Sequence, residues 1–112
     1  MLAPKLYRQR CTIEILTDRN LYDAEIVEAI LENFLHDLCG TLGLTIIEGP
    51  IVKTEEDGTS AYVMFTESGC HVHSWYEHRF VSVDLYSCKP FMVSDVLDVI
   101  EFWFEPKEVE II

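Results

Sequence analysis

The residues that could do chemistry are concentrated between Glu67 and His78 and in the strand-like segment that follows. Three of the four histidines and two of the four cysteines lie between positions 70 and 88. Imidazoles and thiols are the side chains whose ordinary pKa values lie closest to neutral pH. Each residue alone has an ordinary structural explanation, as a surface histidine or a small buried thiol. Their clustering favours a reactive site.

A metal site is one chemistry that this segment allows. His71 and His73 are two residues apart, so on a strand both rings point to one face, and His78 or Cys88 could add a third ligand. Two strand histidines without a third ligand at a firm spacing are a weak pattern, and we predict no metal. A serine hydrolase is weaker still, because Ser68 lacks the nucleophile-elbow pattern and the chain is short for that fold.

The elements that must position these residues follow from the periodicity of apolar side chains. Helical spacing predicts one helix over residues 23–39 that ends at Gly40, and a second that begins with Ser94 as its cap. Gly49-Pro50 should kink the second strand or place it at an edge of the sheet. Alternating or β-rich segments predict six strands, over residues 11–17, 44–52, 60–66, 70–75, 80–87 and 107–112.

The resulting order, β-α-β-β-β-β-α-β, predicts a single domain over residues 1–112. Two helices are too few to cover both faces of a six-stranded sheet, so we expect an α+β fold: a mostly antiparallel sheet with both helices packed on one face. The other face needs a partner, because residues 62–65 are apolar on both sides of their strand. We expect a second copy of the chain there, which gives an αββα sandwich as a homodimer.

Composition narrows the classes of function. The 112 residues include 8 basic and 20 acidic ones, a formal net charge of −12, and 49% are hydrophobic. Such a chain can build a packed core, and its acidity argues against a nucleic-acid partner. We expect no membrane partner, because there is no long apolar run, and residues 1–10 lack the apolar stretch of a signal peptide. Four cysteines without a CxxC pair indicate free thiols, and hence a cytoplasmic protein.

Two adjacent segments carry a resemblance to a known family. Residues 66–78 read TESGCHVHSWYEH, and residues 81–88 read VSVDLYSC. They resemble the prokaryotic S-adenosylmethionine decarboxylase family, which has the motif Glu-Ser-His-x-x-x-His-x-Trp-Pro-Glu and then a strand ending in Asp-x-x-Thr-Cys. Gly69 and Tyr76 depart from that motif, and a looser similarity covers the whole chain. The reactive positions that match at fixed separations are Ser60, Ser68, His73 and Cys88.

The resemblance implies a proenzyme that cleaves itself between Glu67 and Ser68. The Ser68 hydroxyl would attack the Glu67 carbonyl and convert the amide to an ester, and β-elimination would then break the chain. A base near the serine and a hydrogen-bond donor near the developing oxyanion are needed. The resemblance assigns the proton transfer to His73 and the hydrogen bond to Ser60.

The same resemblance implies a β chain of residues 1–67 and an α chain of residues 68–112 that begins with a self-generated pyruvoyl group. This carbonyl would form a Schiff base with the amine of a small-molecule substrate and act as an electron sink when carbon dioxide leaves. Cys88 is the implied acid that reprotonates the α-carbon. Trp75 and Glu77 are the implied substrate-binding residues.

The implied function is the decarboxylation of S-adenosylmethionine for polyamine (spermidine) biosynthesis. Thr54 stands where relatives often carry an aromatic residue that stacks on adenine, so a decarboxylase of L-ornithine or L-arginine in the same fold stays an alternative. A second alternative is a non-enzymatic binding or regulatory paralogue in which Ser68 is never cleaved. These three functions are distinguished by whether the chain cleaves itself and by which substrate amine the cleaved chain binds covalently.

Overall fold

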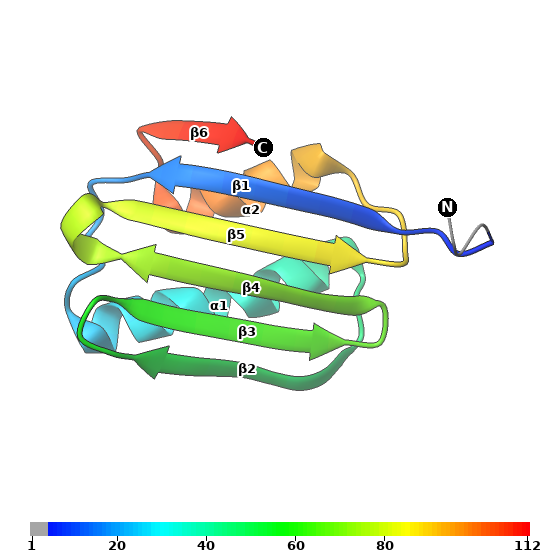
Figure 1. The fold of residues 1–112 in the computed structure, drawn as a ribbon, viewed down its shortest axis with the longest axis horizontal. Coiled ribbons are helices and arrows are strands. Elements are labelled where there is room, and N and C mark those ends of the chain that lie inside the picture. Colours follow the sequence, from blue (N-terminus) through cyan, green and yellow to red (C-terminus); the bar gives the residue numbers. More distant parts are fainter. Residues whose placement is uncertain (1–4) are drawn as a thin grey trace.

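The computed structural model describes residues 5–112, and residues 1–4, which begin the amino-terminal segment considered above, lie outside it. The elements follow the expected order, with one short 3-10 helix in addition (Figure 1). The strands are β1 (Gln9–Leu16), β2 (Ile46–Thr54), β3 (Thr59–Phe65), β4 (Ser68–Trp75), β5 (Phe80–Ser87) and β6 (Glu108–Ile111). The helices are α1 (Ala24–Leu42), η1 (Tyr76–His78) and α2 (Val93–Phe104).

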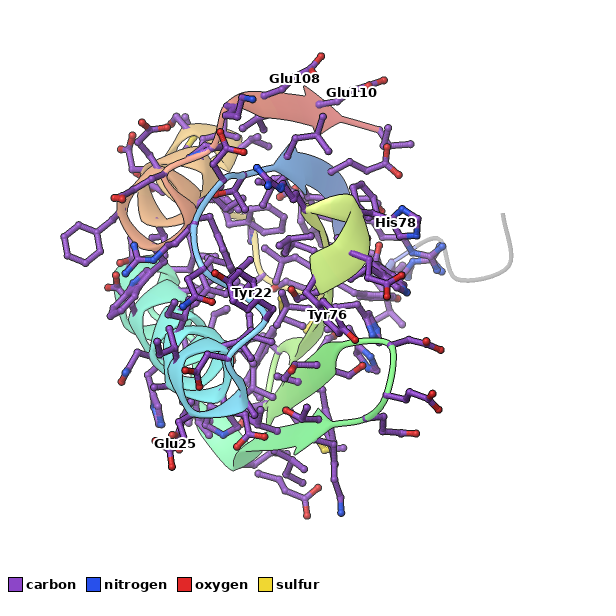
Figure 2. The ribbon with its side chains drawn as sticks, turned by 90° about the vertical axis from the view of Figure 1, so that its left-hand side faces the viewer. Tyr22, Glu25, Tyr76, His78, Glu108 and Glu110 are labelled. Carbon is purple, nitrogen blue, oxygen red and sulfur yellow. The ribbon has the colours of Figure 1, made fainter. Side chains whose placement is uncertain are left out.

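All six strands form one sheet in the order β2-β3-β4-β5-β1-β6, and every neighbouring pair is antiparallel. Seen along the sheet, α1 and α2 lie on the same side of it, and Tyr76 and His78 of η1 lie at the end that faces the viewer (Figure 2). This arrangement confirms the expected α+β fold with both helices on one face. No element of residues 5–112 covers the other face, which we call the open face.

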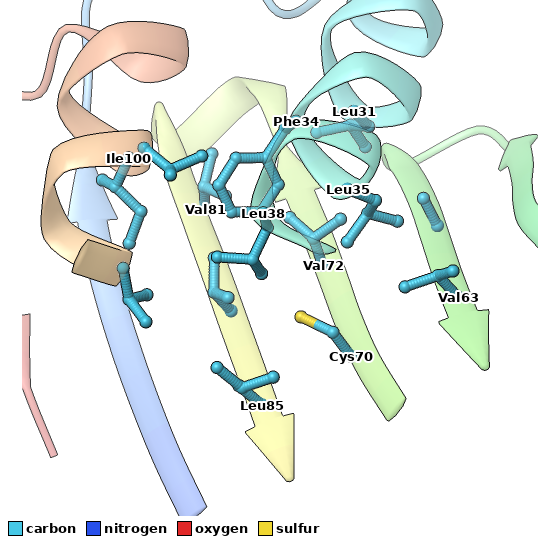
Figure 3. Close-up of a cluster of buried hydrophobic side chains, with 14 of the residues drawn as sticks. Leu31, Phe34, Leu35, Leu38, Val63, Cys70, Val72, Val81, Leu85 and Ile100 are labelled. Carbon is cyan, nitrogen blue, oxygen red and sulfur yellow. The ribbon is translucent and has the colours of Figure 1, made fainter. Parts of the chain in front are cut away.

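The core lies between the helices and the sheet. Leu31, Phe34, Leu35 and Leu38 form the buried stripe of α1 and point at the inner side chains of β3, β4 and β5 (Figure 3). The rings of Phe34 and Phe104 join the two helices, with their centroids 4.9 Å apart. Because strand side chains alternate between faces, this core also determines which residues reach the open face.

Both helices differ at one end from the prediction. α1 continues through Gly40, because buried Leu42 extends its apolar stripe, and it ends at Gly43, whose φ of 68° is the left-handed conformation of a helix cap. α2 begins after Met92 without a side-chain cap, so the prediction of Ser94 as the cap is wrong. Neither helix within residues 5–112 has the length and apolar character that crossing a membrane requires.

The second strand, β2, is an edge strand, as Gly49-Pro50 predicted. Its pairing with β3 shifts register on both sides of Glu48. Gly49 has a φ of 89°, and a Cβ there would lie 2.9 Å from the carbonyl oxygen of Tyr62, so only glycine fits. The irregularity is confined to β2, and the pairing of β3 with β4 and of β4 with β5 is regular.

Candidate active site

The Glu67–Ser68 peptide bond lies in the tight turn between β3 and β4. Phe65 pairs with Ser68 across this turn, so only Thr66 and Glu67 connect the two strands. Ser68 has a φ of 144°, a region that residues with a side chain rarely adopt. Such a conformation costs on the order of 1–3 kcal/mol. The bond that the resemblance expects to break is therefore next to a strained residue.

The carbonyl of Glu67 already accepts a hydrogen bond from a neighbouring segment. The backbone N–H of Cys88 donates to it, with 2.7 Å between nitrogen and oxygen. Cys88 comes directly after β5, whose last residue, Ser87, pairs with Ser68. A donor aimed at a carbonyl oxygen stabilises the negative charge that forms there when a nucleophile adds. The structure thus brings Glu67, Ser68 and Cys88 together at one end of the sheet, on the right in Figure 1.

Cys88 differs from the other three cysteines. Its side chain is exposed, whereas Cys11, Cys39 and Cys70 are buried. Burial raises the pKa of each buried thiol, and for Cys39 it reaches about 11 because the charge of Glu67 adds to the effect. Buried thiols with a raised pKa stay protonated and inert. Among the cysteines, Cys88 is therefore the one available to a substrate.

Ser60 and His73 form a second cluster, at the other end of β3 and β4. They are paired directly across the two strands, and the Ser60 hydroxyl lies 2.9 Å from Nδ1 of His73. We call them the serine–histidine pair. The register of β3 against β4 is unbroken, so Gly69 does not shift it, and alternation assigns Ser68 and His73 to opposite faces. At about 3.3 Å per residue they are roughly 16 Å apart along β4, so a single chain does not bring the imidazole to Ser68.

A pocket of about 300 Å³ opens beside the serine–histidine pair. It is also lined by Trp75, Ser74 and residues 55–58, the turn between β2 and β3, which supplies three carboxylates. Sequence reasoning did not include this turn in the site. The signal was present, because a turn that immediately precedes the strand of Ser60 must lie at the same end of the sheet.

The two expected substrate-binding residues line different pockets. Trp75 belongs to a row of rings on the open face whose neighbouring centroids are 5.5–6.0 Å apart: Tyr62, His71, His73, Trp75 and Phe80. Glu77 lies in η1 and lines a different pocket, together with Tyr22 and Arg79. The aromatic row is the continuous surface beside the serine–histidine pair.

The rings of His71 and His73 lie on one face, as their spacing predicted, with centroids 6.0 Å apart. Throughout the described chain, no three or more His, Cys, Asp or Glu side chains are grouped so that they could hold a metal ion. His78 lies in η1, and Cys88 lies beside Glu67. The histidine pair thus gains no third ligand from residues 5–112.

Comparison with known proteins assigns the chain to a family. A family model described as S-adenosylmethionine decarboxylase matches residues 10–112. The chain belongs to the S-adenosylmethionine decarboxylase family. This confirms the family to which the residues of the two motif segments pointed.

Individual members of the S-adenosylmethionine decarboxylase family show the extent of the similarity. A relative named S-adenosylmethionine decarboxylase proenzyme, from Acetivibrio thermocellus, is 31% identical over 78 residues, which are 70% of this chain and 56% of that relative. One of the same name from Aquifex aeolicus is 26% identical over 101 residues, 88% of this chain and 75% of the relative. The first alignment therefore spans little more than half of that relative's length.

The crystal structure of the adenosylmethionine decarboxylase from Aquifex aeolicus has the same fold. It matches this chain with a TM-score of 0.73, covering 96% of this chain and 88% of that one at 22% sequence identity. The likeness confirms the arrangement of six antiparallel strands and two helices as a fold of the S-adenosylmethionine decarboxylase family.

Proposed function

We propose that this chain is the proenzyme of a pyruvoyl-dependent S-adenosylmethionine decarboxylase of polyamine (spermidine) biosynthesis, a carboxy-lyase that cleaves itself between Glu67 and Ser68. The observation that carries the proposal is the strained backbone of Ser68 beside a Glu67 carbonyl that already accepts the N–H of Cys88. The family of the chain and the proenzyme names of its relatives support both the self-cleavage and the substrate.

The proposed cleavage takes place at one peptide bond. Ser68 Oγ adds to the carbonyl carbon of Glu67, the C–N bond breaks, and the hydroxyl proton moves to the nitrogen, which leaves an ester and a free amine. A base then removes the Cα proton of Ser68 and the Cβ–Oγ bond breaks, so that Glu67 leaves as a carboxylate. The remaining dehydroalanine tautomerises to an imine, adds water and loses ammonia. The products are the β chain, residues 1–67, and the α chain, residues 68–112, with a pyruvoyl amino end.

The residues beside the turn suit a pyruvoyl group at position 68. The Cys88 N–H, which binds the Glu67 carbonyl before cleavage, remains available to the oxygen of the departing carboxylate. A pyruvoyl group supplies an electrophilic carbonyl that binds the substrate amine and accepts electrons as carbon dioxide leaves. We assign to the exposed thiol of Cys88 the return of a proton to the substrate's α-carbon.

In our proposal, the serine–histidine pair of one chain acts on Ser68 of a second copy of the chain. His73 as the proton-transfer group and Ser60 as a donor to the intermediate are roughly 16 Å from Ser68 of their own chain. A two-fold axis that lies across the strands, with the open faces together, puts the serine–histidine end of one chain over the β3–β4 turn of the other. Ser68, whose φ of 144° lies outside regular strand geometry, must then turn its hydroxyl toward that pair. The aromatic row of the open face supplies the apolar contact area. The mature enzyme is then a homodimer of processed αβ protomers.

The other functions considered above are not favoured, because the relatives are named for S-adenosylmethionine rather than for ornithine or arginine, and as proenzymes rather than as binding proteins. Thr54 stands where relatives often carry an aromatic residue that stacks on adenine, and its hydroxyl donates to Glu28 of α1 instead. All four cysteines are free thiols, which supports the cytoplasmic location that we propose with this function.

Intact mass tests the proposal. We expect the purified chain to resolve into two fragments that correspond to residues 1–67 and 68–112, the second with a blocked amino end. Ser68→Ala should remain a single 13.0 kDa species, because it has no hydroxyl to attack the carbonyl. Ser94→Ala, an exposed serine of α2, is the matched control and should split like the wild type. A wild-type chain that stays whole after long incubation at neutral pH would refute self-cleavage.

A further inference from the structure

We propose that the side-chain carboxylate of Glu67 is a positioning group for self-cleavage: bound by the backbone N–H of Thr45, it holds the β3–β4 turn in the conformation that strains Ser68. The inference rests on the proposed function, because it concerns how the same bond is held before it breaks. It assigns to the Glu67 side chain a role separate from that of its carbonyl.

One side of the turn is held by the segment that leads into β2. The N–H of Thr45 donates to Oε1 of Glu67 at 3.0 Å, and the N–H of Thr66 donates to the carbonyl of Thr45 at 2.8 Å. The first of these bonds is the main reason why the pKa of Glu67 lies below its usual value. The carboxylate is therefore ionised at neutral pH, and a hydrogen bond to a charged acceptor is stronger than one to a neutral acceptor.

The other side of the turn is held by the loop between β5 and α2. The N–H of Cys88 binds the carbonyl of Glu67 at 2.7 Å. The next residue, Lys89, donates its Nζ to the carbonyl of Gly43 at 2.9 Å, and its charge favours the ionised form of Glu67. Lys89 thus connects this loop to the loop that contains Thr45, and Glu67 is bound from both.

These contacts explain how a serine is kept at a φ of 144°. A free two-residue turn would rotate to relieve this strain. One loop binds the carboxylate of Glu67, and another binds its carbonyl, which is part of the peptide plane between Glu67 and Ser68. Together the two bonds hold the side chain of Glu67 and that peptide plane in place. A charge-assisted hydrogen bond is comparable in strength to the cost of one strained residue, so the bond from Thr45, together with that from Cys88, opposes relaxation of the turn.

The test compares rates of self-cleavage in full chains synthesised in a cell-free system and followed by intact mass. We expect Glu67→Ala to split roughly 10- to 100-fold more slowly than the wild type, because it loses the bond from Thr45. Glu67→Gln keeps an acceptor oxygen but not the charge, so its rate should lie between the two. Glu25→Gln, which alters an exposed carboxylate of α1, is the control and should split at the wild-type rate.

Two further measurements separate positioning from a general structural role. In the uncleavable Ser68→Ala background, adding Glu67→Ala should leave the melting temperature nearly unchanged, and a loss on the order of 10 °C would overturn the inference. The far-UV circular dichroism of the two uncleavable chains should also be the same, because positioning acts on one turn and not on the fold. If the wild type splits and Glu67→Ala splits equally fast, the inference is wrong and the proposed function stands. If the wild type does not split, both are wrong.

Discussion

The two ends of β4 carry different kinds of chemistry. Where β4 begins, the site is distinguished by its backbone, which has a serine at an unfavourable φ and a carbonyl bound by a neighbouring N–H. Where β4 ends, the important groups are side chains on the open face, the serine–histidine pair and Trp75, beside a turn with three carboxylates. The first end can hold a bond under strain and the second can move a proton. The unbroken register of β4 keeps these two capacities apart within one chain.

Complementation between two inactive variants tests whether the two ends of β4 from different chains form one site. Chains that carry Ser68→Ala have no hydroxyl to attack, and chains that carry His73→Ala lack the base, so neither should split when produced alone. If a partner supplies the serine–histidine pair, co-production should cause the His73→Ala chains to split, because the partner's pair is intact. Mass spectrometry with one chain isotopically labelled identifies which chain is cut.

Failure of this complementation would contradict the shared site, provided that sedimentation shows that the two variants form a mixed dimer. A monomer at micromolar concentration would contradict the proposed pairing of open faces without any variant.

Cys88→Ala distinguishes the role of the Cys88 backbone N–H from the role of its thiol. The N–H that binds the Glu67 carbonyl remains, so we expect the chain to split at close to the wild-type rate. Decarboxylation of S-adenosylmethionine should fall about 100-fold or more, because the proton donor to the α-carbon is lost. Unchanged turnover would show that the thiol has no part in the reaction. Cyanoborohydride trapping with S-adenosylmethionine, ornithine and arginine in turn identifies the amine that this end accepts.

Gly58→Ala perturbs the other end of the sheet. A Cβ at Gly58 would lie 1.9 Å from the carbonyl oxygen of Ser74, so the turn between β2 and β3 must move away from β4. We expect a loss of about 1–3 kcal/mol in the free energy of unfolding, measured by urea titration, and an altered pocket beside the serine–histidine pair. Gly40→Ala is the matched control: apart from the nearby backbone of α1 itself, no atom of the described chain lies within 4 Å of a Cβ there, and alanine in a helix should stabilise the chain by about 1 kcal/mol.

Removal of a surface ion pair near η1 should change the stability of the fold only slightly. Asp18 accepts from Arg79 at 2.7 Å and lies 3.3 Å from Lys107, and these contacts lower the pKa of Asp18 in the folded chain. A carboxyl whose folded pKa is lowered stabilises the fold above its unfolded pKa of about 3.9, and this contribution is lost as the pH falls through the folded value.

Asp18→Asn should therefore lower the melting temperature slightly at neutral pH and not below the folded pKa of Asp18. High salt should reduce the difference. Asp98→Asn, an exposed position on α2, is the control. An Asp18→Asn effect that persists at low pH would show that the side chain acts through packing rather than charge.

Side-chain periodicity in the sequence predicts the main elements of this fold. The alternation of β5 gave its bounds, residues 80–87, and the apolar stripes gave both helices and the face that they cover. It was less reliable at helix ends: the buried Leu42 carries α1 past Gly40 to a glycine that can adopt a positive φ. The direct pairing of Ser60 with His73 depends on strand register, which the length of the β3–β4 turn sets.

Two parts of the candidate site could not be predicted from residue types. The N–H of Cys88 that binds the Glu67 carbonyl is a backbone group, which every residue except proline has, so nothing in the sequence marks it. The positive φ of Ser68 occurs at a residue type that normally avoids it, next to Glu67, whose partners lie in loops distant in sequence. Both belong to the end of β4 where the strained serine lies.

The irregular edge strand β2 limits how copies of this chain can associate. Pro50 has no N–H to offer to a further strand, and the register shifts around Glu48 bend the outer hydrogen-bonding groups away from a straight row. At the opposite edge, β6 has only four residues, two of them glutamates. Neither border therefore templates the lateral growth that produces fibrils, which leaves the open face as the surface for the proposed homodimer.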